Sequence, residues 1–262
     1  MSESTIDYDT YKLSCHLPPA GSEECLVFLH GLQSNKSLFD DLRQLLHQKF
    51  DYPQFAMDYL GFGNSSKPGN FSYDLGEQTD MVIGVLKKIG IKKVHLVGHS
   101  RGGMIGTLML QRAPEMMLSL VSMEGNLQLE DCGESRNVAA MDFDLFQREY
   151  YPMLKAKLET SSELSAQARR KALELIPDYA FYRTAKSIVV WAESGRLHDI
   201  FTTAHMPRLL ICGKNSGFQS RPQGQNASIA EINHATHFML SDNPVDTVAS
   251  IMHFLSAHIH LT

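Results

Sequence analysis

The stretch VGHSRGG, residues 97–103, places a single serine, Ser100, between two glycines directly after the apolar run VHLV of residues 94–97. Residues 102–112 then carry apolar side chains at helical spacing, so Ser100 stands between a predicted strand and a predicted helix. A serine in a sharp turn from strand to helix is typical of a nucleophile elbow, which presents its hydroxyl for attack. The stretch therefore predicts a nucleophilic serine on a scaffold of alternating strands and helices.

The positions of the glycines fit this interpretation. An elbow holds its serine in a strained backbone conformation, and a Cβ two residues before or after it would collide with the neighbouring strand and helix. Gly98 and Gly102 occupy those two positions.

Negative charge that develops on a substrate oxygen needs N–H donors close to the serine. Ser100 stands at a predicted helix N-terminus, where free N–H groups and the helix dipole favour such charge, so the N–H of Arg101 is one expected donor. A second donor is expected from the loop His30-Gly31-Leu32, which follows the predicted strand 25–29, and we assign it to the N–H of Leu32. Gly31 is the glycine of this loop.

The rest of the chain repeats the same rhythm of buried strands and amphipathic helices. The strands and helices are predicted at 25–29, 37–49, 55–57, 73–89, 94–97, 102–112, 118–123, 208–212, 228–232 and 244–258. This alternation predicts a parallel sheet covered by helices. Residues 127–205 lose the alternation and become helical, charged and rich in Met, Tyr and Phe, which indicates an inserted cap.

Four blocks of the chain, FLHGLQSNKSLFDDL, MDYLGFGNSSKP, VHLVGHSRGG and NHATHFMLSDNPVDTVASIMHFL, resemble the ordered signature blocks of the α/β-hydrolase superfamily. The resemblance implies an α/β-hydrolase fold: a mostly parallel eight-stranded sheet with helices on both faces and a helical cap inserted after the sixth strand. We accordingly expect a core domain of residues 1–126 and 206–262 and a cap of residues 127–205.

The resemblance also places the general base. A base must be neutral near pH 7 and must reach the serine hydroxyl, and histidine meets both demands. The superfamily carries its histidine in a loop before the closing helix, and the segment ATHF puts His237 there. His234, three residues earlier, is the competing candidate.

The acid departs from the family pattern. Relatives carry an aspartate just after the strand written LLICGKNSGF here, and Ser216 stands at that place. Glu124 follows the preceding predicted strand, and parallel strands end together at one edge of a sheet, so its carboxylate could approach His237 from there. Some superfamily members take their acid from this strand. A salt bridge or a turn cap is the alternative role for Glu124, and Asp131 and Asp199 are weaker substitutes.

Composition narrows the class of protein. The 262 residues carry 24 basic and 29 acidic side chains, well mixed, for a net charge of -5, so nucleic acid is not expected as a partner. The four cysteines lie far apart without metal-ligand spacing, and we expect neither a metal nor an organic cofactor. The N-terminus lacks the features of a signal peptide and no apolar run could span a bilayer, which favours a cytoplasmic protein. The oligomeric state stays open.

These features favour a serine hydrolase that cleaves a carboxylic ester, or a related acyl or C–C bond, through Ser100, His237 and Glu124. Ten residues of the predicted cap are expected either to cover an apolar or aromatic part of a small-molecule substrate or to pack in the core: Phe143, Phe146, Tyr150, Tyr151, Met153, Leu154, Tyr179, Phe181, Tyr182 and Trp191. Two alternatives remain. One is a cofactor-free dioxygenase similar to the enzymes that cleave hydroxyquinolone rings with a His-acid pair, and the other is a non-catalytic, ligand-binding superfamily member. Dehalogenase and epoxide hydrolase chemistry is disfavoured, because those relatives use aspartate where Ser100 stands.

Overall fold

The computed structural model describes residues 3–259, which fold around an eight-stranded sheet of order β1-β2-β4-β3-β5-β6-β7-β8. The strands are β1 (Ser4–Tyr8), β2 (Tyr11–His16), β3 (Glu24–Leu29), β4 (Gln54–Met57), β5 (Lys93–His99), β6 (Met117–Met123), β7 (Arg208–Gly213) and β8 (Ala227–Ile232). β1 and β2 pair antiparallel with each other, and β2 pairs antiparallel with β4, whereas every other neighbouring pair is parallel. The predicted mostly parallel eight-stranded sheet is confirmed.

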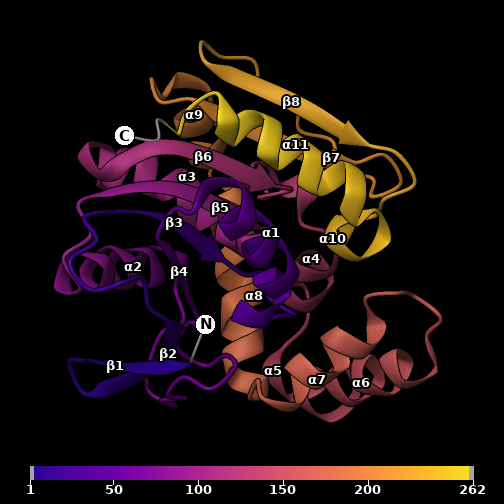
Figure 1. Cartoon of the computed structure of the whole chain (residues 1–262). Coiled ribbons are helices and arrows are strands. Elements are labelled where there is room, and N and C mark those ends of the chain that lie inside the picture. Colours follow the sequence, from indigo (N-terminus) through magenta and orange to yellow (C-terminus); the bar gives the residue numbers. More distant parts are fainter. Residues whose placement is uncertain (1–2, 260–262) are drawn as a thin grey trace.

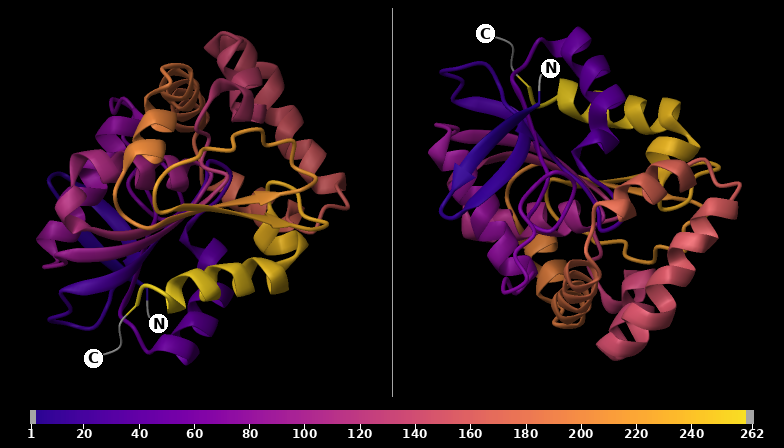
Figure 2. Two further views of the ribbon diagram at one scale, coloured as in Figure 1. Left: turned by 90° about the horizontal axis from the view of Figure 1, so that it is seen from above. Right: turned by 90° about the horizontal axis from the view of Figure 1, so that it is seen from below.

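Helices cover both faces of this sheet, as predicted. They are α1 (Asp40–Phe50), α2 (Leu75–Lys88), α3 (Arg101–Arg112), α4 (Gly133–Ala139), α5 (Phe143–Leu145), α6 (Tyr151–Thr160), α7 (Ala166–Glu174), α8 (Asp178–Glu193), α9 (Arg196–Thr203), α10 (Met239–Asp242) and α11 (Pro244–Ser256). α1 and α11 lie on one face, and α2, α3, α8 and α9 lie on the other (Figures 1 and 2). Short helical turns are η1 (Lys36–Phe39), η2 (Pro114–Met116), η3 (Leu129–Asp131) and η4 (Phe146–Tyr150).

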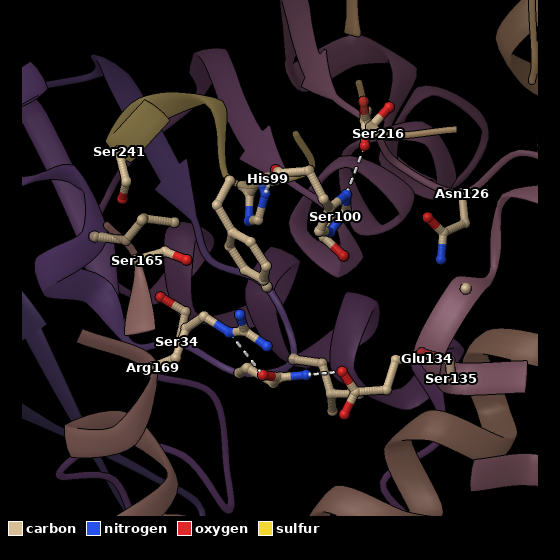
Figure 3. A pocket seen from close by; sticks show the side chains of 18 of the residues that line it. Ser34, His99, Ser100, Asn126, Glu134, Ser135, Ser165, Arg169, Ser216 and Ser241 are labelled. Carbon is tan, nitrogen blue, oxygen red and sulfur yellow. Dashed lines mark hydrogen bonds and ion pairs between the residues drawn. The ribbon is translucent and has the colours of Figure 1, made fainter. Parts of the chain in front are cut away.

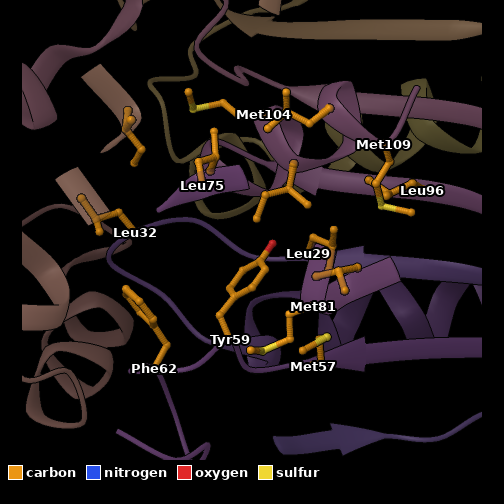
Figure 4. Packing of buried hydrophobic residues seen from close by; sticks show 14 of the residues in the cluster. Leu29, Leu32, Met57, Tyr59, Phe62, Leu75, Met81, Leu96, Met104 and Met109 are labelled. Atoms are coloured by element: carbon orange, nitrogen blue, oxygen red, sulfur yellow. The ribbon is translucent and has the colours of Figure 1, made fainter. Parts of the chain in front are cut away.

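The sheet separates two buried apolar clusters. On one face, Phe28 and Val97 pack with apolar residues of α1 and α11. On the other face, Leu29 and Leu96 pack with Met104 of α3 and with residues of α2, a packing shown in Figure 4. The central parallel strands β3 and β5 are therefore apolar on both faces, which explains why they appear in the sequence as continuous apolar runs.

Two helix starts differ from the sequence prediction for local reasons. The helix predicted from Tyr73 begins at Leu75, because the carboxylate of Asp74 accepts hydrogen bonds from the N–H groups of Gly76 and Glu77 and caps the helix there. The helix predicted at 37–49 is divided into the turn η1 and the helix α1. Neither difference changes the topology.

The helices α4 to α9 all fall between β6 and β7, where the sequence loses its alternation. We call residues 127–205 the helical segment. α4 contacts α8, and α6 contacts α7, while α8 and α9 also contact the helices on the sheet. Within residues 3–259, none of the helices has the length and apolar character needed to cross a membrane.

Candidate active site

Ser100 occupies a strained turn at the end of β5. Its φ of 54° and ψ of -119° lie outside the conformations that L-residues ordinarily adopt, and its N–H donates to the carbonyl of Met123 on the neighbouring strand, 2.8 Å away. Close packing of the surrounding backbone maintains this strained conformation, since a Cβ on Gly98 would lie 2.4 Å from the carbonyl carbon of Gly102. A Cβ on Gly102 would lie 1.9 Å from the carbonyl oxygen of Leu29. The two glycines are therefore required by sterics at the turn.

His237 meets the carboxylate of Glu124. Nδ1 of His237 lies 2.6 Å from Oε2 of Glu124, although the two residues are 113 positions apart in the chain. Glu124 directly follows β6, has a φ of 46°, and its side chain is 1% exposed. Its other carboxylate oxygen, Oε1, accepts a hydrogen bond of 2.8 Å from the N–H of Gly213 at the end of β7. Both carboxylate oxygens thus have a partner, and their directions are fixed.

Burial by itself would raise the pKa of Glu124. The hydrogen bond from His237 and the nearby imidazole lower this pKa, the hydroxyl of Ser216 and the N–H of Gly213 lower it further, and their sum holds it below its ordinary value. Glu124 is accordingly ionised near neutral pH. Ser216, which stands where the resemblance implies an aspartate, lies next to the carboxylate that reaches His237.

The weaker acid candidates lie in other surroundings. The carboxylate of Asp131 accepts hydrogen bonds from the backbone of residues 127, 128, 219 and 220, and so it ties two loops together. Asp199 is on the surface, with an 82% exposed side chain. His234, the competing base, is also exposed and has a positive φ of 54°. Asp131 lines the same cavity as Glu124 and His237, but backbone N–H groups occupy its carboxylate, and the carboxylate bound to Nδ1 of His237 is that of Glu124.

His99 fixes the backbone beside His237. Its Nε2 lies 2.8 Å from the carbonyl oxygen of His237, and burial, together with the neighbouring His237 ring, lowers the pKa of His99 to about 3. A neutral imidazole with its proton on Nε2 donates this hydrogen bond. His99 thus holds the loop of His237 in position from the strand that carries Ser100.

The peptide between Gly31 and Leu32 is oriented by two buried side chains. Nδ1 of His30 lies 2.8 Å from the carbonyl oxygen of Gly31, and Nη2 of Arg101 donates to the same oxygen at 3.4 Å. Burial lowers the pKa of His30 well below its ordinary value, so the ring is neutral and carries its proton on Nδ1. In a trans peptide the N–H points opposite to the carbonyl. The N–H of Leu32 therefore points away from the guanidinium of Arg101.

The Arg101 side chain is fully buried. Its guanidinium carbon lies 4.1 Å from the ring centroid of Tyr59 and 3.8 Å from that of Phe62, and Nε and Nη1 find no hydrogen-bond partner within residues 3–259. Burial lowers the pKa of Arg101 to about 10, which leaves it charged at pH 7. Figure 4 shows Tyr59 and Phe62 beneath the loop that carries Leu32. The side chain of this arginine thus contacts two aromatic rings and one backbone carbonyl.

A cavity of about 530 Å³ opens over these residues. Ser100, Glu124 and His237 line it together with Gly31 and Leu32. Its other walls come from α4, from α7 and the preceding Ser165, and from the segments 33–38, 126–132, 216–218 and 238–241. Figure 3 shows Ser100 on one side of this cavity and Arg169 and Glu134 on another.

Four side chains that line the cavity were not predicted from the sequence. Gln33, Glu134, Arg169 and Phe238 line it, whereas the ten aromatic and apolar residues expected either to cover a substrate or to pack in the core do not. Most of those ten pack with one another, as Phe146 does against rings on α5, α6 and α8. Two of the missed residues had a signal, because Gln33 directly follows Leu32 and Phe238 directly follows His237. Glu134 and Arg169 had none, since charged helical positions are usually solvated.

The fold is that of a known family. The profile of the α/β-hydrolase-fold family matches residues 24–242, and the chain belongs to that family. Among its relatives, 2-(acetamidomethylene)succinate hydrolase of Mesorhizobium japonicum is 23% identical over 95% of this chain and 94% of its own length. An uncharacterized hydrolase of Bacillus subtilis is 35% identical, over 37% of this chain and 35% of that protein.

Solved structures show the same fold. The enol-lactonase of Burkholderia xenovorans superposes with a TM-score of 0.79 at 15% identity, over 97% of this chain and 100% of that one. The family match and the curated relatives make the chain a hydrolase of the α/β-hydrolase superfamily, and this likeness shows the shared fold.

Proposed function

We propose that the protein is a serine hydrolase that cleaves carboxylic esters through a triad of Ser100, His237 and Glu124. One observation carries the proposal: the strained Ser100 lines the same cavity as a histidine whose Nδ1 is bound by a buried, ionised carboxylate. A histidine held in this way has Nε2 free to accept a proton, which is the state a general base needs.

The reaction follows from the roles of the three side chains. The hydroxyl oxygen of Ser100 attacks the substrate carbonyl carbon while its proton passes to Nε2 of His237, and Glu124 stabilises the imidazolium that forms. The tetrahedral intermediate collapses, the C–O bond to the alcohol breaks, and His237 returns the proton to the leaving oxygen. Water then attacks the acyl-enzyme, with His237 as base, and releases the acid and Ser100.

The negative oxygen of each tetrahedral intermediate requires donors in place beforehand. The N–H of Arg101 lies in the first turn of α3, where N–H groups have no partner inside the helix. The N–H of Leu32 is the second donor, and the support of the Gly31 carbonyl by His30 and Arg101 favours this assignment. We assign the oxyanion hole to these two backbone groups.

We further propose that residues 127–205 are a cap over a core of residues 1–126 and 206–262, because α4 and α7 supply walls of the cavity. Leu32, Leu38, Phe218 and Phe238 give the cavity apolar surface, which suits an apolar or aromatic group of a small ester. The same Ser-His pair can also cleave a C–C bond next to a carbonyl, which stays within the proposed class.

The intact mass of the protein after incubation with a fluorophosphonate tests the proposal. We expect a single adduct on the native chain and none on Ser100→Ala or His237→Ala. The matched controls are Ser241→Ala, a serine of the same cavity outside the elbow, and His234→Ala; both should be labelled like the native chain. Absence of an adduct on folded native protein would overturn the proposal. Oxygen consumption with hydroxyquinolones would then test the His-acid dioxygenase.

A further inference from the structure

The cavity wall opposite Ser100 contains a continuous chain of polar contacts. Nε of Arg169 on α7 donates to Oε1 of Gln33 at 2.9 Å, and Nε2 of Gln33 donates to Oε2 of Glu134 on α4 at 2.5 Å. Figure 3 shows these contacts between Arg169 and Glu134. A side-chain amide placed between a guanidinium and a carboxylate has one orientation that satisfies both neighbours, so the position of Gln33 is well defined.

Arg169 also contacts the opposite side of the cavity. Its guanidinium carbon lies 4.2 Å from the ring centroid of Phe238, and that ring meets the ring of His237 edge-on at a centroid distance of 5.3 Å. One side chain of the helical segment therefore contacts the residue after Leu32 and the residue after His237.

The guanidinium is itself held firmly. Its Nη1 donates to Oε2 of Glu163 at 2.6 Å, and the Arg169 side chain is only 11% exposed. A charged group that is bonded to two partners and stacked on a ring has few alternative positions. Gln33, which is 8% exposed, has correspondingly little freedom.

From these contacts we propose that Arg169 is a positioning residue that couples the helical segment to the loop of Leu32 and to the loop of His237. The proposal rests on the proposed function, since it assigns the alignment of the oxyanion donor and of the base to one guanidinium. When α7 is docked, Gln33 fixes the backbone beside Leu32 and Phe238 limits the position of His237. Loss of the guanidinium would remove the support of both loops together. Catalytic competence thereby depends on the contacts that Arg169 makes from α7.

Steady-state kinetics with p-nitrophenyl acetate and p-nitrophenyl butyrate test this coupling. Arg169→Met keeps the apolar stem and removes the guanidinium, and we expect kcat to fall by about 10- to 100-fold with a smaller change in KM, because small misplacements of reacting groups cost rates of this size. Arg169→Lys should also lose most of this rate, since an ammonium cannot donate to two partners and cover a ring in the same geometry. Arg170→Met, on the exposed side of α7, is the matched control and should retain native kcat.

A double-mutant cycle separates positioning from general stability. If Arg169 acts through Gln33, the double variant of Gln33→Met and Arg169→Met should have nearly the kcat of Arg169→Met alone, so that the two losses do not multiply. The thermal midpoints identify any variant that has unfolded. If Arg169→Met is destabilised, the kcat of the folded Arg169→Lys variant tests the proposal instead.

The outcomes distinguish the two proposals. Native kcat in a folded Arg169 variant, or losses that multiply fully in the cycle, would overturn the coupling while fluorophosphonate labelling of the native chain still supported the triad. Failure of the native chain to be labelled or to cleave either ester would overturn the proposed function itself, and the coupling with it.

Discussion

The carboxylate of Glu124 lies 2.6 Å from Nδ1 of His237 and is held from its other side by the N–H of Gly213. If this contact orients the base, Glu124→Gln should fold normally and lose about 10⁴ in kcat, the loss found when the orienting acid of a serine protease is neutralised. Single-turnover acylation and circular dichroism of the same samples check both parts. Asp131→Asn is the control and should keep near-native kcat. Near-native kcat in Glu124→Gln would remove Glu124 from the proposed triad.

Gly102 has no space for a side chain. Since a Cβ there would lie 1.9 Å from a backbone oxygen of Leu29, which cannot rotate away, Gly102→Ala should lower the free energy of unfolding by about 3 kcal/mol or more. Urea unfolding at fixed pH measures this loss. Gly69→Ala is the matched control, because nothing lies within 4 Å of a Cβ at that position. Equal unfolding midpoints for the two variants would contradict the steric argument.

Replacing the Arg101 side chain should lower kcat without lowering the thermal midpoint. Arg101→Met retains the backbone N–H of residue 101 but removes one of the two donors to the Gly31 carbonyl. We expect kcat to fall by about 10-fold, less than the 10²–10³ found when an oxyanion donor is removed outright. The thermal midpoint should stay the same or rise, because apolar residues often replace a buried charge without loss. An unchanged kcat would show that His30 alone orients the peptide.

Glu134 should make stability depend on pH. Burial raises its pKa above the ordinary value of 4.5, against smaller lowering effects of Gln33 and Arg169. Below pH 4.5 both the folded and the unfolded states are protonated, and Glu134 contributes nothing. As pH rises from 4.5 to the raised folded pKa, the unfolded state releases this proton more readily than the folded state, so the folded state loses stability relative to it, and the loss is complete above the folded pKa.

Glu134→Gln should therefore match the native chain near pH 4.5 and exceed its thermal midpoint at pH 8. Paired thermal scans across this range provide the measurement, with Glu130→Gln, an exposed carboxylate at the same cavity, as control. A lower midpoint for Glu134→Gln at pH 8 would mean that the ionised form stabilises the fold.

The sequence by itself determined the features that depend on local pattern. The buried parallel strands were predicted from apolar runs, and α3 was predicted from apolar residues at helical spacing. The elbow around Ser100 was predicted from glycines two residues before and after it, a spacing that backbone sterics require. Each of these depends on residues a few positions apart. The resemblance between four short blocks and a known family added the number of strands, their mostly parallel arrangement and the position of His237.

Tertiary structure alone decided which distant side chains meet. The candidate acid could be narrowed to Glu124 and weaker substitutes from the sequence, but the 2.6 Å contact of Glu124 with His237 depends on how β6, β7 and the loop after β8 are packed. The polar chain of Gln33, Glu134 and Arg169 depends in the same way on where α4 and α7 dock. Periodicity reports which face of an element is buried and carries no information about its partner, so such contacts follow only from the packed fold.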